Sequence, residues 1–145
     1  MACNTTNGEG VVTNREMIKA LIERTYEARR TDDIEGTLAA FHADGKFELA
    51  GSKEHTPATG SAQGHQELRV TFAKLIAAFQ FVERDILSLV IEDKRAAVHS
   101  RVKLRFVPKD RTVTTDLIDL WKFRDGKVVE LVEFADTALI NDLMS

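Results

Sequence analysis

Two acidic side chains, Asp119 and Glu133, occupy positions in the last third of the chain whose neighbours are otherwise apolar. The residues that alternate with them are Leu117, Trp121 and Phe123 for the first acid, and Val129, Leu131 and Ala135 for the second. Burying an unpaired carboxylate costs several kcal/mol or shifts its pKa, so each acid either faces water or lies in a pocket. Two carboxyl groups in one apolar pocket raise the pKa of one of them, which yields an acid and a base from the same chemistry.

Such a pair of carboxyl groups can act on a carbonyl compound. Removing a proton beside a carbonyl group requires a base near the substrate and a donor that holds the enolate oxygen. Asp119 and Glu133 supply both if one of them is protonated, and Tyr26, on a predicted helix, is a further candidate donor. We therefore predict that Asp119 and Glu133 are catalytic groups, and we expect no cofactor.

The turn between the two strands that carry these acids decides whether they share a face. A three-residue loop over residues 124–126 places both acids on one face and makes Leu117 oppose Glu133. A two-residue turn over residues 125–126 instead points Glu133 to the opposite face, because side chains alternate along a strand. The residues alone leave both registers open.

The composition is that of an ordinary globular chain and limits the classes of partner. The chain has 145 residues, enough for one domain with one core, and a net charge of −3 with both signs interspersed. The sequence therefore has no excess of basic residues that would indicate binding to nucleic acid, and no basic patch that would indicate binding to a membrane surface. The lone Cys3 excludes an internal disulfide, and no residues stand at the spacing of metal ligands. No signal peptide or membrane-spanning run is visible, so we expect a cytoplasmic protein.

The first half of the chain predicts three helices and one strand. Residues 1–12 are polar and are expected to form a disordered tail, which leaves one domain over residues 13–145. Apolar residues at helical spacing predict a helix over about residues 14–30, a short second helix that "HADG" ends, and a third over residues 65–79. "KFELAG" predicts a short strand, and residues 51–64, rich in Gly, Ser and Thr, predict a long loop.

The second half of the chain alternates with a period of two residues, which predicts antiparallel strands. Four strands are expected at about residues 81–92, 96–108, 112–123 and 127–135, followed by a short helix over residues 136–143. On the second of these strands the charged side is His99, Arg101, Lys103 and Arg105. We expect this side to face outward from the sheet, where cross-strand charge pairs stabilise it.

Helices followed by strands in this order predict the α+β fold class. The sheet is expected to be long, curved and antiparallel, and to wrap around the three helices as a cone. Such a cone leaves an apolar pocket at its wide end. Beside the two acids, the side chains predicted to line this pocket are Tyr26, Leu49, Phe72, Phe106, Leu117, Trp121 and Leu131.

Three stretches carry a family resemblance: "TDDIEGTLAAFHADGKFEL" (residues 31–49), "GHQEL" (residues 64–68) and "DLWKFRDGKVVELVEFADT" (residues 119–137). They resemble the SnoaL-like and ketosteroid isomerase-like group of the nuclear transport factor 2-like superfamily. The resemblance extends from about residue 14 to the end and implies a cone of the cystatin-like α+β barrel type. It also implies a homodimer through the convex face of the sheet, and it favours the register that puts both acids on one face.

The resemblance also implies roles for individual residues. Ketosteroid isomerases use a first-strand aspartate as the base, and a helix tyrosine and a protonated late-strand acid as oxyanion donors. Asp119 matches the late-strand acid, Tyr26 is adjacent to the tyrosine position, and Leu49 falls at the position of the base. In limonene epoxide hydrolase an acid on the last strand activates water, and Glu133 matches that position. Polyketide cyclases of the SnoaL type require little more than one pocket acid or base beside an enolisable chain.

Two functions of different classes follow from these observations. The first is a pocket protein that performs isomerase-type or cyclase-type acid–base chemistry on a carbonyl compound, without a cofactor or a metal. The second is a ligand-binding or dimerisation module of the same fold without chemistry, which the apolar Leu49 at the base position favours. In the first case the ligand is a small hydrophobic organic molecule, and in both we expect a homodimer.

Overall fold

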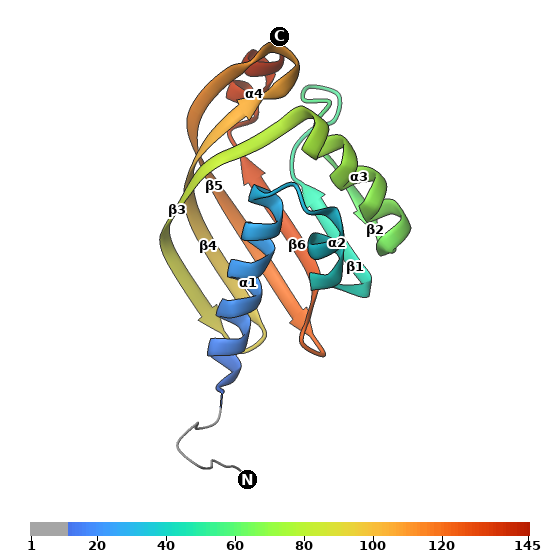
Figure 1. Cartoon of the computed structure of the whole chain (residues 1–145), viewed down its shortest axis with the longest axis vertical. Coiled ribbons are helices and arrows are strands. Elements are labelled where there is room, and N and C mark those ends of the chain that lie inside the picture. The colour runs from blue at the N-terminus through green and yellow to red at the C-terminus, as the bar shows by residue number, and fades with distance from the viewer. Residues whose placement is uncertain (1–11) are drawn as a thin grey trace.

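The computed structural model describes residues 12–145 as four α-helices, a short 3-10 helix and six strands (Figure 1). In chain order the elements are α1 (Asn14–Arg30), α2 (Ile34–Ala40), β1 (Phe41–Leu49), β2 (Gly60–Gln63), α3 (Gly64–Ala78), β3 (Phe79–Glu92), β4 (Arg95–Phe106), η1 (Val107–Lys109), β5 (Arg111–Arg124), β6 (Lys127–Ala135) and α4 (Thr137–Met144). Cys3 and all but the last residue of the predicted disordered tail, residues 1–12, lie outside the described residues. Within residues 12–145, no helix is both long and apolar enough to cross a membrane.

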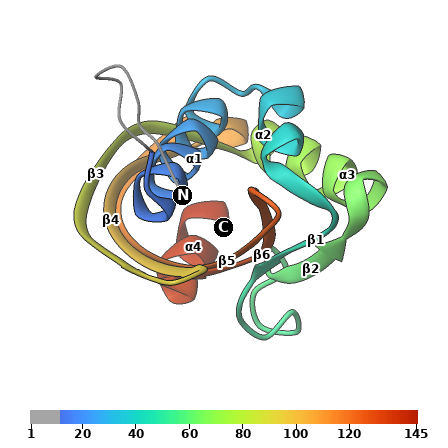
Figure 2. The ribbon, with the colours of Figure 1, turned by 90° about the horizontal axis from the view of Figure 1, so that it is seen from below.

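The six strands form one curved sheet in the order β2-β1-β6-β5-β4-β3, and this sheet wraps around α1 (Figure 2). Four of the neighbouring pairs are antiparallel, and one pair, β1 with β6, is parallel. The predicted α+β fold with a curved sheet around helices is confirmed. The sheet is mixed rather than wholly antiparallel because β1 enters it beside the last strand, in the same direction.

Helix α1 lies along the concave face of the sheet, and its sequence determines its start and its buried side. Thr13 begins the helix with a capping box: its Oγ1 accepts from the Glu16 amide at 3.0 Å, and Glu16 Oε1 accepts from the Thr13 amide at 3.1 Å. The buried side consists of Ile18, Leu21, Ile22, Thr25, Tyr26 and Ala28. This stripe fixes the rotation of α1, so that Tyr26 reaches across to β5.

The junction between α2 and β1 differs from the sequence prediction. The helix ends at Ala40, and "HADG" belongs to β1 instead of preceding it. The register of β1 against β6 shifts between Phe41 and Lys46, so these polar residues form an irregularity within the strand. Gly45 is required there, because a Cβ would lie 2.8 Å from the carbonyl oxygen of His42.

The long loop predicted over residues 51–64 is shorter in the structure. Its residues 60–63 form β2, which pairs antiparallel with residues 46–49 of β1. Helix α3 then begins at Gly64. The sequence "GSAQ" has no intrinsic preference for a strand, so its pairing follows from the edge that β1 offers on its free side.

Two hydrophobic clusters fill the concave side of the sheet. The larger one packs α1, α2 and α3 against β1, β5 and β6, and it contains Tyr26, Phe72 and Trp121. The smaller one lies at the end of the molecule where α4 covers the sheet (Figure 1), and it contains Phe106 and Leu117. The two ends of the cone are therefore filled by different residues, and the buried hydrogen bond between Tyr26 and Asp119 belongs to the larger cluster.

Candidate active site

A cavity of about 20 Å³ lies inside the larger cluster, between α1 and the sheet, with space for about one water molecule. Its aromatic walls are the rings of Phe41, Phe47, Phe72, Phe81 and Trp121. Its polar side chains are those of Thr25, Tyr26, Arg29, Thr37, Arg84 and Glu133. Apolar walls with a few converging polar groups are the usual composition of a small-molecule site.

The β5–β6 hairpin brings the two acids together. It combines the two-residue turn of one predicted register with the shared face of the acids that the other predicted. Asp125 and Gly126 form a two-residue turn, with φ of 53° and 72°, as a type I′ turn requires. The pairing of the strands then shifts between Lys122 and Phe123, which leaves Val129 as an extra residue in β6. This β-bulge reverses the alternation of β6 beyond the turn.

As a result of the bulge, Asp119 lies directly opposite Glu133, and both acids are on the concave face. The expectation that the acids share a face agrees with this register. The three-residue loop and the pairing of Leu117 with Glu133 are wrong, because Leu117 pairs with Ala135. If Val129 instead paired regularly with Lys122, without a bulge, Glu130 would face inward in place of Leu131, as the second predicted register requires.

Asp119 is fully buried, with an exposed fraction of 0%. Tyr26 Oη donates to its Oδ2 at 2.5 Å, and Arg84 Nη1 lies 3.7 Å from the same oxygen. Burial and the adjacent Glu133 carboxylate raise the pKa of Asp119 well above its usual range, and Arg84 and Tyr26 only partly oppose this. The other oxygen, Oδ1, is buried without a hydrogen-bond donor. A proton on Oδ1 allows Asp119 to donate to Glu133, which satisfies both carboxyl groups with one shared proton.

Tyr26 and Arg84 hold Asp119 from the side of α1. Burial and the charge of Asp119 raise the pKa of Tyr26, so its hydroxyl remains a neutral donor. The Arg84 guanidinium carbon lies 3.7 Å from the centroid of the Tyr26 ring, and its Nη1 donates to Ser100 Oγ at 3.0 Å. Trp121 packs against Tyr26 edge to face, with 5.5 Å between ring centroids. These contacts fix the position of the Tyr26 hydroxyl.

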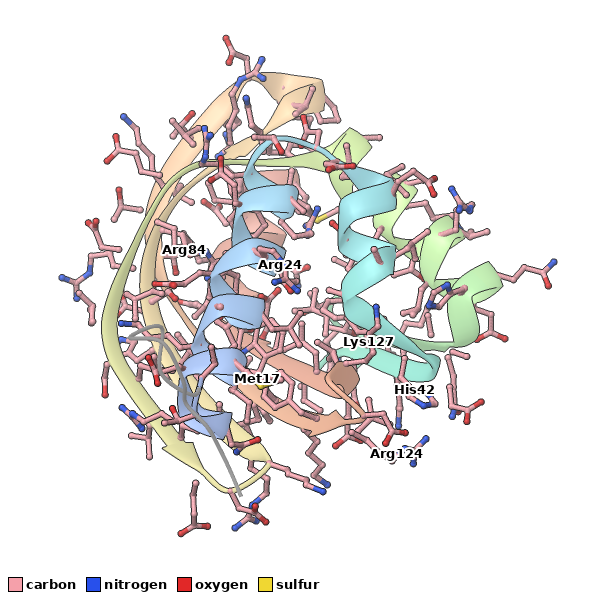
Figure 3. All side chains as sticks on the ribbon, turned by 60° about the horizontal axis from the view of Figure 1, so that its bottom comes forward. Met17, Arg24, His42, Arg84, Arg124 and Lys127 are labelled. Atoms are coloured by element: carbon pink, nitrogen blue, oxygen red, sulfur yellow. The ribbon has the colours of Figure 1, made fainter. Side chains whose placement is uncertain are left out.

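Arg84 reaches the cavity because β3 also contains a bulge. The register of β3 against β4 shifts between Phe81 and Glu83, which leaves Val82 as an extra residue. Strict alternation from Phe81 would point Glu83 inward, whereas in the structure Arg84 lies opposite the buried Val102. Figure 3 shows Arg84 beside α1 on the side of β3. The sequence reasoning missed this residue, since the strand contains no Gly or Pro that would mark a bulge.

Arg29, in the last turn of α1, brings a second guanidinium to the cavity. Its guanidinium carbon lies 5.4 Å from the ring centroid of Phe72 and 5.2 Å from that of Phe81. The residue as a whole is partly exposed, but its Nη1 is buried and has no hydrogen-bond partner. Burial lowers the pKa of Arg29, and the charge of Glu133 opposes that effect. Sequence reasoning missed Arg29 although it follows the buried Tyr26 by three residues, the spacing of one helix face.

The structure gathers most of the predicted pocket residues and separates three of them. The residues at the cavity are Tyr26, Phe72, Trp121, Leu131 and Glu133, with Asp119 bonded to Tyr26. Phe106 and Leu117 instead pack in the smaller cluster beside α4, and Leu49 lines a separate groove with residues of α3 and of the loop before β2. Phe106 and Leu117 lie farther along the strands than the acids do, so they do not line this cavity. Leu49 pairs with Glu133 in the register of β1 against β6, but it lines the neighbouring groove instead of the cavity. Residues 12–145 contain no cluster of three or more His, Cys, Asp or Glu that could hold a metal ion.

Solved structures of the same fold include proteins of several kinds. An NTF2-like protein of unknown function from Burkholderia pseudomallei has 21% sequence identity and a TM-score of 0.78, over 89% of this chain and 98% of that one. TerC, co-crystallised with polyporic acid, has 21% identity and a TM-score of 0.77, over 88% and 98% of the two chains. A protein proposed to be a polyketide cyclase, from Xanthomonas campestris pv. campestris, has 15% identity and a TM-score of 0.74, over 92% and 100%. At these identities the likeness shows the fold alone.

The family model of the SnoaL-like domain matches residues 22–131 of the chain. No curated protein matches the chain at a significant level. The matched residues run from the third turn of α1 to the middle of β6, and they include Tyr26, Arg29, Arg84 and Asp119. Because this match covers more than half of the chain, it shows that the chain belongs to the SnoaL-like domain family.

Proposed function

We propose that this protein binds a small, mostly hydrophobic organic molecule in the cavity and performs acid–base chemistry on a carbonyl group. The observation that carries the proposal is the Asp119–Glu133 pair: the fully buried Asp119 lies directly opposite the half-buried Glu133, and burial together with the Glu133 carboxylate raises the pKa of Asp119. A fold gains nothing from placing two acids together in its core, since a buried carboxyl group without a partner is costly. Paired titratable groups in a cavity are instead a frequent feature of catalytic sites.

The proposed reaction moves one proton and needs no redox partner. Glu133, which lines the cavity, removes a proton from the carbon beside the carbonyl group; the electron pair of the broken C–H bond forms a C=C bond as the π pair of the carbonyl group moves onto oxygen. Asp119, protonated and held by Tyr26, keeps its own proton, so the pair carries one negative charge before the transfer and none after it. Return of the proton from Glu133 to a second carbon completes an isomerisation. Attack of the enolate carbon on a second carbonyl group forms a C–C bond and an alkoxide, and the proton on Glu133 passes to that alkoxide oxygen to complete a cyclisation.

A ligand can enter from a groove of about 280 Å³ outside the cavity, between α1 and the β5–β6 turn. Residues of the groove and of the cavity are neighbours on the same elements: on α1, Leu21 of the groove is one helix turn before Thr25 of the cavity, and on β5, Phe123 of the groove is the next inward-facing residue after Trp121 of the cavity. The rings of Phe123 and Trp121 are stacked, with an interplanar angle of 4° and 5.9 Å between centroids. Figure 3 shows other residues of the groove, Met17 and Arg24 on α1 and Arg124 on the hairpin. Rotation of Phe123 would join the two spaces into a pocket large enough for a small organic molecule.

Deuterium exchange tests the proposed chemistry. The protein is mixed in D₂O with phenylpyruvate or phenylacetone, and loss of the protons beside the carbonyl group is followed by ¹H NMR. We expect exchange above the buffer rate, and we expect Glu133→Gln to reduce that excess by at least about 100-fold, as loss of a general base does. Glu130→Gln is the matched control on the same strand, where the side chain pairs with Lys122 at 3.3 Å on the convex face. Exchange no faster than in buffer, or unchanged in Glu133→Gln, would contradict the proposal.

A second candidate function is a binding module of the same fold that performs no chemistry. The observation that favours it is Leu49 at the first-strand position where ketosteroid isomerases hold their base, and Leu49 does not line the cavity. The two functions differ in the exchange experiment. A binding module would bind the probes and change the fluorescence of Trp121 without accelerating exchange.

We further propose that the protein is a homodimer through the convex face of the sheet. Three apolar side chains of that face are strongly exposed: Val90 (59%), Leu120 (43%) and Phe134 (47%). They surround a groove of about 530 Å³ whose rim carries Glu92, Arg95, Lys122 and Glu130. A rim with both signs of charge is suited to a second copy related by a two-fold axis, because opposite charges can then meet.

Sedimentation velocity at several protein concentrations tests this assembly. We expect a dimer for the wild-type chain and a monomer for Leu120→Glu, because a charge at the centre of the patch would be buried without a partner. Thr114→Glu is the matched control: it lies on the same exposed face of β5 but outside the groove. A wild-type monomer at all concentrations would contradict the proposal.

A further inference from the structure

Three buried side-chain polar atoms in residues 12–145 have no hydrogen-bond partner, and all three belong to the proposed site. They are Arg29 Nη1, Trp121 Nε1 and Asp119 Oδ1. Arg29 and Trp121 line the cavity, and Asp119 is bonded to Tyr26, which also lines it. Buried polar groups are almost always satisfied in folded proteins, so orphan groups that gather in one place indicate a site prepared for a ligand. A proton shared with Glu133 satisfies Asp119 Oδ1. Two donors, Arg29 Nη1 and Trp121 Nε1, then remain without an acceptor.

Arg29 is held in place by contacts that do not use its hydrogen-bonding capacity. Its guanidinium lies over the rings of Phe72 and Phe81, within 5.4 Å of each centroid. Residues 12–145 offer it no carboxylate within 4.0 Å. In contrast, the other guanidinium of the site, that of Arg84, is 3.7 Å from Asp119 and bonded to Ser100. Arg29 is therefore positioned by aromatic packing, and its Nη1 faces a polar partner that the protein itself does not supply.

The charges of the site leave an excess of positive charge. The two guanidinium groups are both charged, because arginine stays protonated in proteins. With one proton shared by Asp119 and Glu133, the carboxyl pair carries a single negative charge. The site therefore holds two positive charges against one negative charge, which leaves one positive charge uncompensated. Arg84 lies 3.7 Å from Asp119, whereas Arg29 has no carboxylate contact and receives only the field of Glu133, so we assign the excess to Arg29. In a cavity with aromatic walls this charge attracts an anion strongly, because little water is present to screen it.

We propose that Arg29 binds a negatively charged oxygen of the ligand, so that the substrates are enolisable carbonyl compounds with an acidic group, a carboxylate or an acidic enol. This inference rests on the proposed function and assigns its substrate class. The rings of Phe72, Phe81 and Trp121 contact the flat, apolar part of the same molecule. Trp121 Nε1 is a second donor for an oxygen of the ligand.

Arg29 also fits the proton transfer. When Glu133 takes the proton from carbon, the electron pair of the C–H bond forms the C=C bond of the enolate, and the charge moves onto oxygen. A guanidinium beside that oxygen stabilises the enolate more than the neutral ketone, because the interaction grows as the charge develops. The proton on Glu133 then returns to carbon, and no further reactant is consumed.

A purely structural role of Arg29, as a counter-charge for Glu133, predicts something different. In that role Arg29 would be neutralised within the protein, and the cavity would bind neutral and anionic molecules of one shape equally well. The preference between such molecules therefore separates the two roles. Trp121, the single tryptophan of the chain, reports binding directly because it lines the cavity.

The experiment is a titration of the Trp121 fluorescence with phenylacetate and with phenylacetamide, which have the same ring and differ in charge. We expect wild-type protein to bind phenylacetate at least ten-fold more tightly. Arg29→Met is expected to abolish this preference, and Arg29→Lys to retain a reduced one, since it keeps the charge but not the planar fork. Arg30→Met is the matched control on α1, where the guanidinium is exposed and pairs with Glu27 at 2.7 Å.

Equal binding of the two probes by the wild-type protein would overturn the inference, and this result does not depend on any variant folding. A preference that persists in Arg29→Met would overturn it as well. Failure of the proposed function gives a different pattern: the anion preference is present, but phenylpyruvate exchanges its protons no faster than in buffer. Conversely, equal acceleration of phenylpyruvate and phenylacetone that Arg29→Met leaves unchanged would retain the function and remove the role of Arg29.

Discussion

Replacing Asp119 by asparagine tests whether its carboxyl group is protonated in the folded protein. Asparagine keeps an oxygen that accepts from the Tyr26 hydroxyl, and its Nδ2 can donate to Glu133. It therefore copies the hydrogen bonds of a protonated Asp119 but cannot titrate. The two proteins should differ chiefly in how their free energy of unfolding depends on pH.

The magnitude follows from the linkage between proton binding and folding. A carboxyl group whose pKa is raised in the folded state stabilises the protein fully below the unfolded pKa, about 3.9 for Asp. That contribution is lost as the pH rises through the folded pKa. In this window the wild-type protein loses about 1.4 kcal/mol per pH unit relative to Asp119→Asn. The window is wide because burial, and then Glu133, raise the pKa of Asp119 well above its usual range.

Urea unfolding at a series of pH values measures this difference. We expect the stability of Asp119→Asn relative to the wild type to rise with pH above about 4 and to level off at the folded pKa. A difference that stays constant between about pH 4 and pH 8 would refute a protonated Asp119, and with it the shared proton on which the proposed chemistry depends.

Asp116→Asn is a control with the opposite sign. Asp116 lies on the same strand, but Arg101 and then His99 hydrogen-bond to it and lower its pKa. Its contribution to stability is therefore present above the unfolded pKa and lost as the pH falls through the folded pKa. The stability of Asp116→Asn relative to the wild type should fall with rising pH, by a small amount because the pair is exposed.

Three further predictions concern the framework of the site. Deleting Val129, the extra residue of the bulge, should keep the Asp119–Glu133 pairing and the proton exchange, whereas deleting Val132 should turn Glu133 outward and abolish exchange. Tyr26→Phe should cost about 1–3 kcal/mol in urea unfolding, since the buried Asp119 loses its donor. Phe123→Ala should increase the rate at which phenylacetate quenches Trp121 in stopped flow, because Phe123 separates the groove from the cavity.

The fold follows from patterns that are local in the sequence. The capping residue Thr13 and the apolar stripe that follows it define α1, and the helix occupies the predicted range. Strict alternation likewise gives the buried face of β4, from Val98 to Phe106, and its charged outer face. His99 and Arg101 both pair with Asp116 across the strands, as cross-strand pairing predicts. Where the period of the apolar residues and the residue types indicate the same element, the sequence is sufficient to predict that element and its buried face.

The errors in the sequence prediction occur where tertiary contacts override local preference. The strand β2 has no strand-forming residues, and its backbone is recruited by the free edge of β1. The early start of β1 depends on Gly45, whose missing Cβ allows the irregular backbone near His42. Phe106 and Leu117 were predicted at the pocket because they alternate correctly, but alternation reports the face of a strand and not the position along it. Leu49 was predicted there from the family resemblance, and although it pairs with Glu133 it lines the neighbouring groove.

The charged residues of the site also differ in whether the sequence alone could place them on the inward face of the sheet. Asp119 could be found from the sequence because β5 alternates without interruption from Thr115 to Phe123. Glu133 and Arg84 depend on bulges at Val129 and Val82, each of which exchanges the inward and outward sides of its strand. Neither bulge has a sequence signal, because valine fits a regular strand equally well.

Bulges at these positions have a consequence for the chemistry. A regular β6 would present Glu130 to the cavity, and a regular β3 would present Glu83, so the interior would hold three acids and only Arg29 as a positive charge. With both bulges, the interior holds two acids and two arginines, and one shared proton leaves it suited to an anion. The registers that the two bulges set therefore determine the sign of the charge that the cavity can accept.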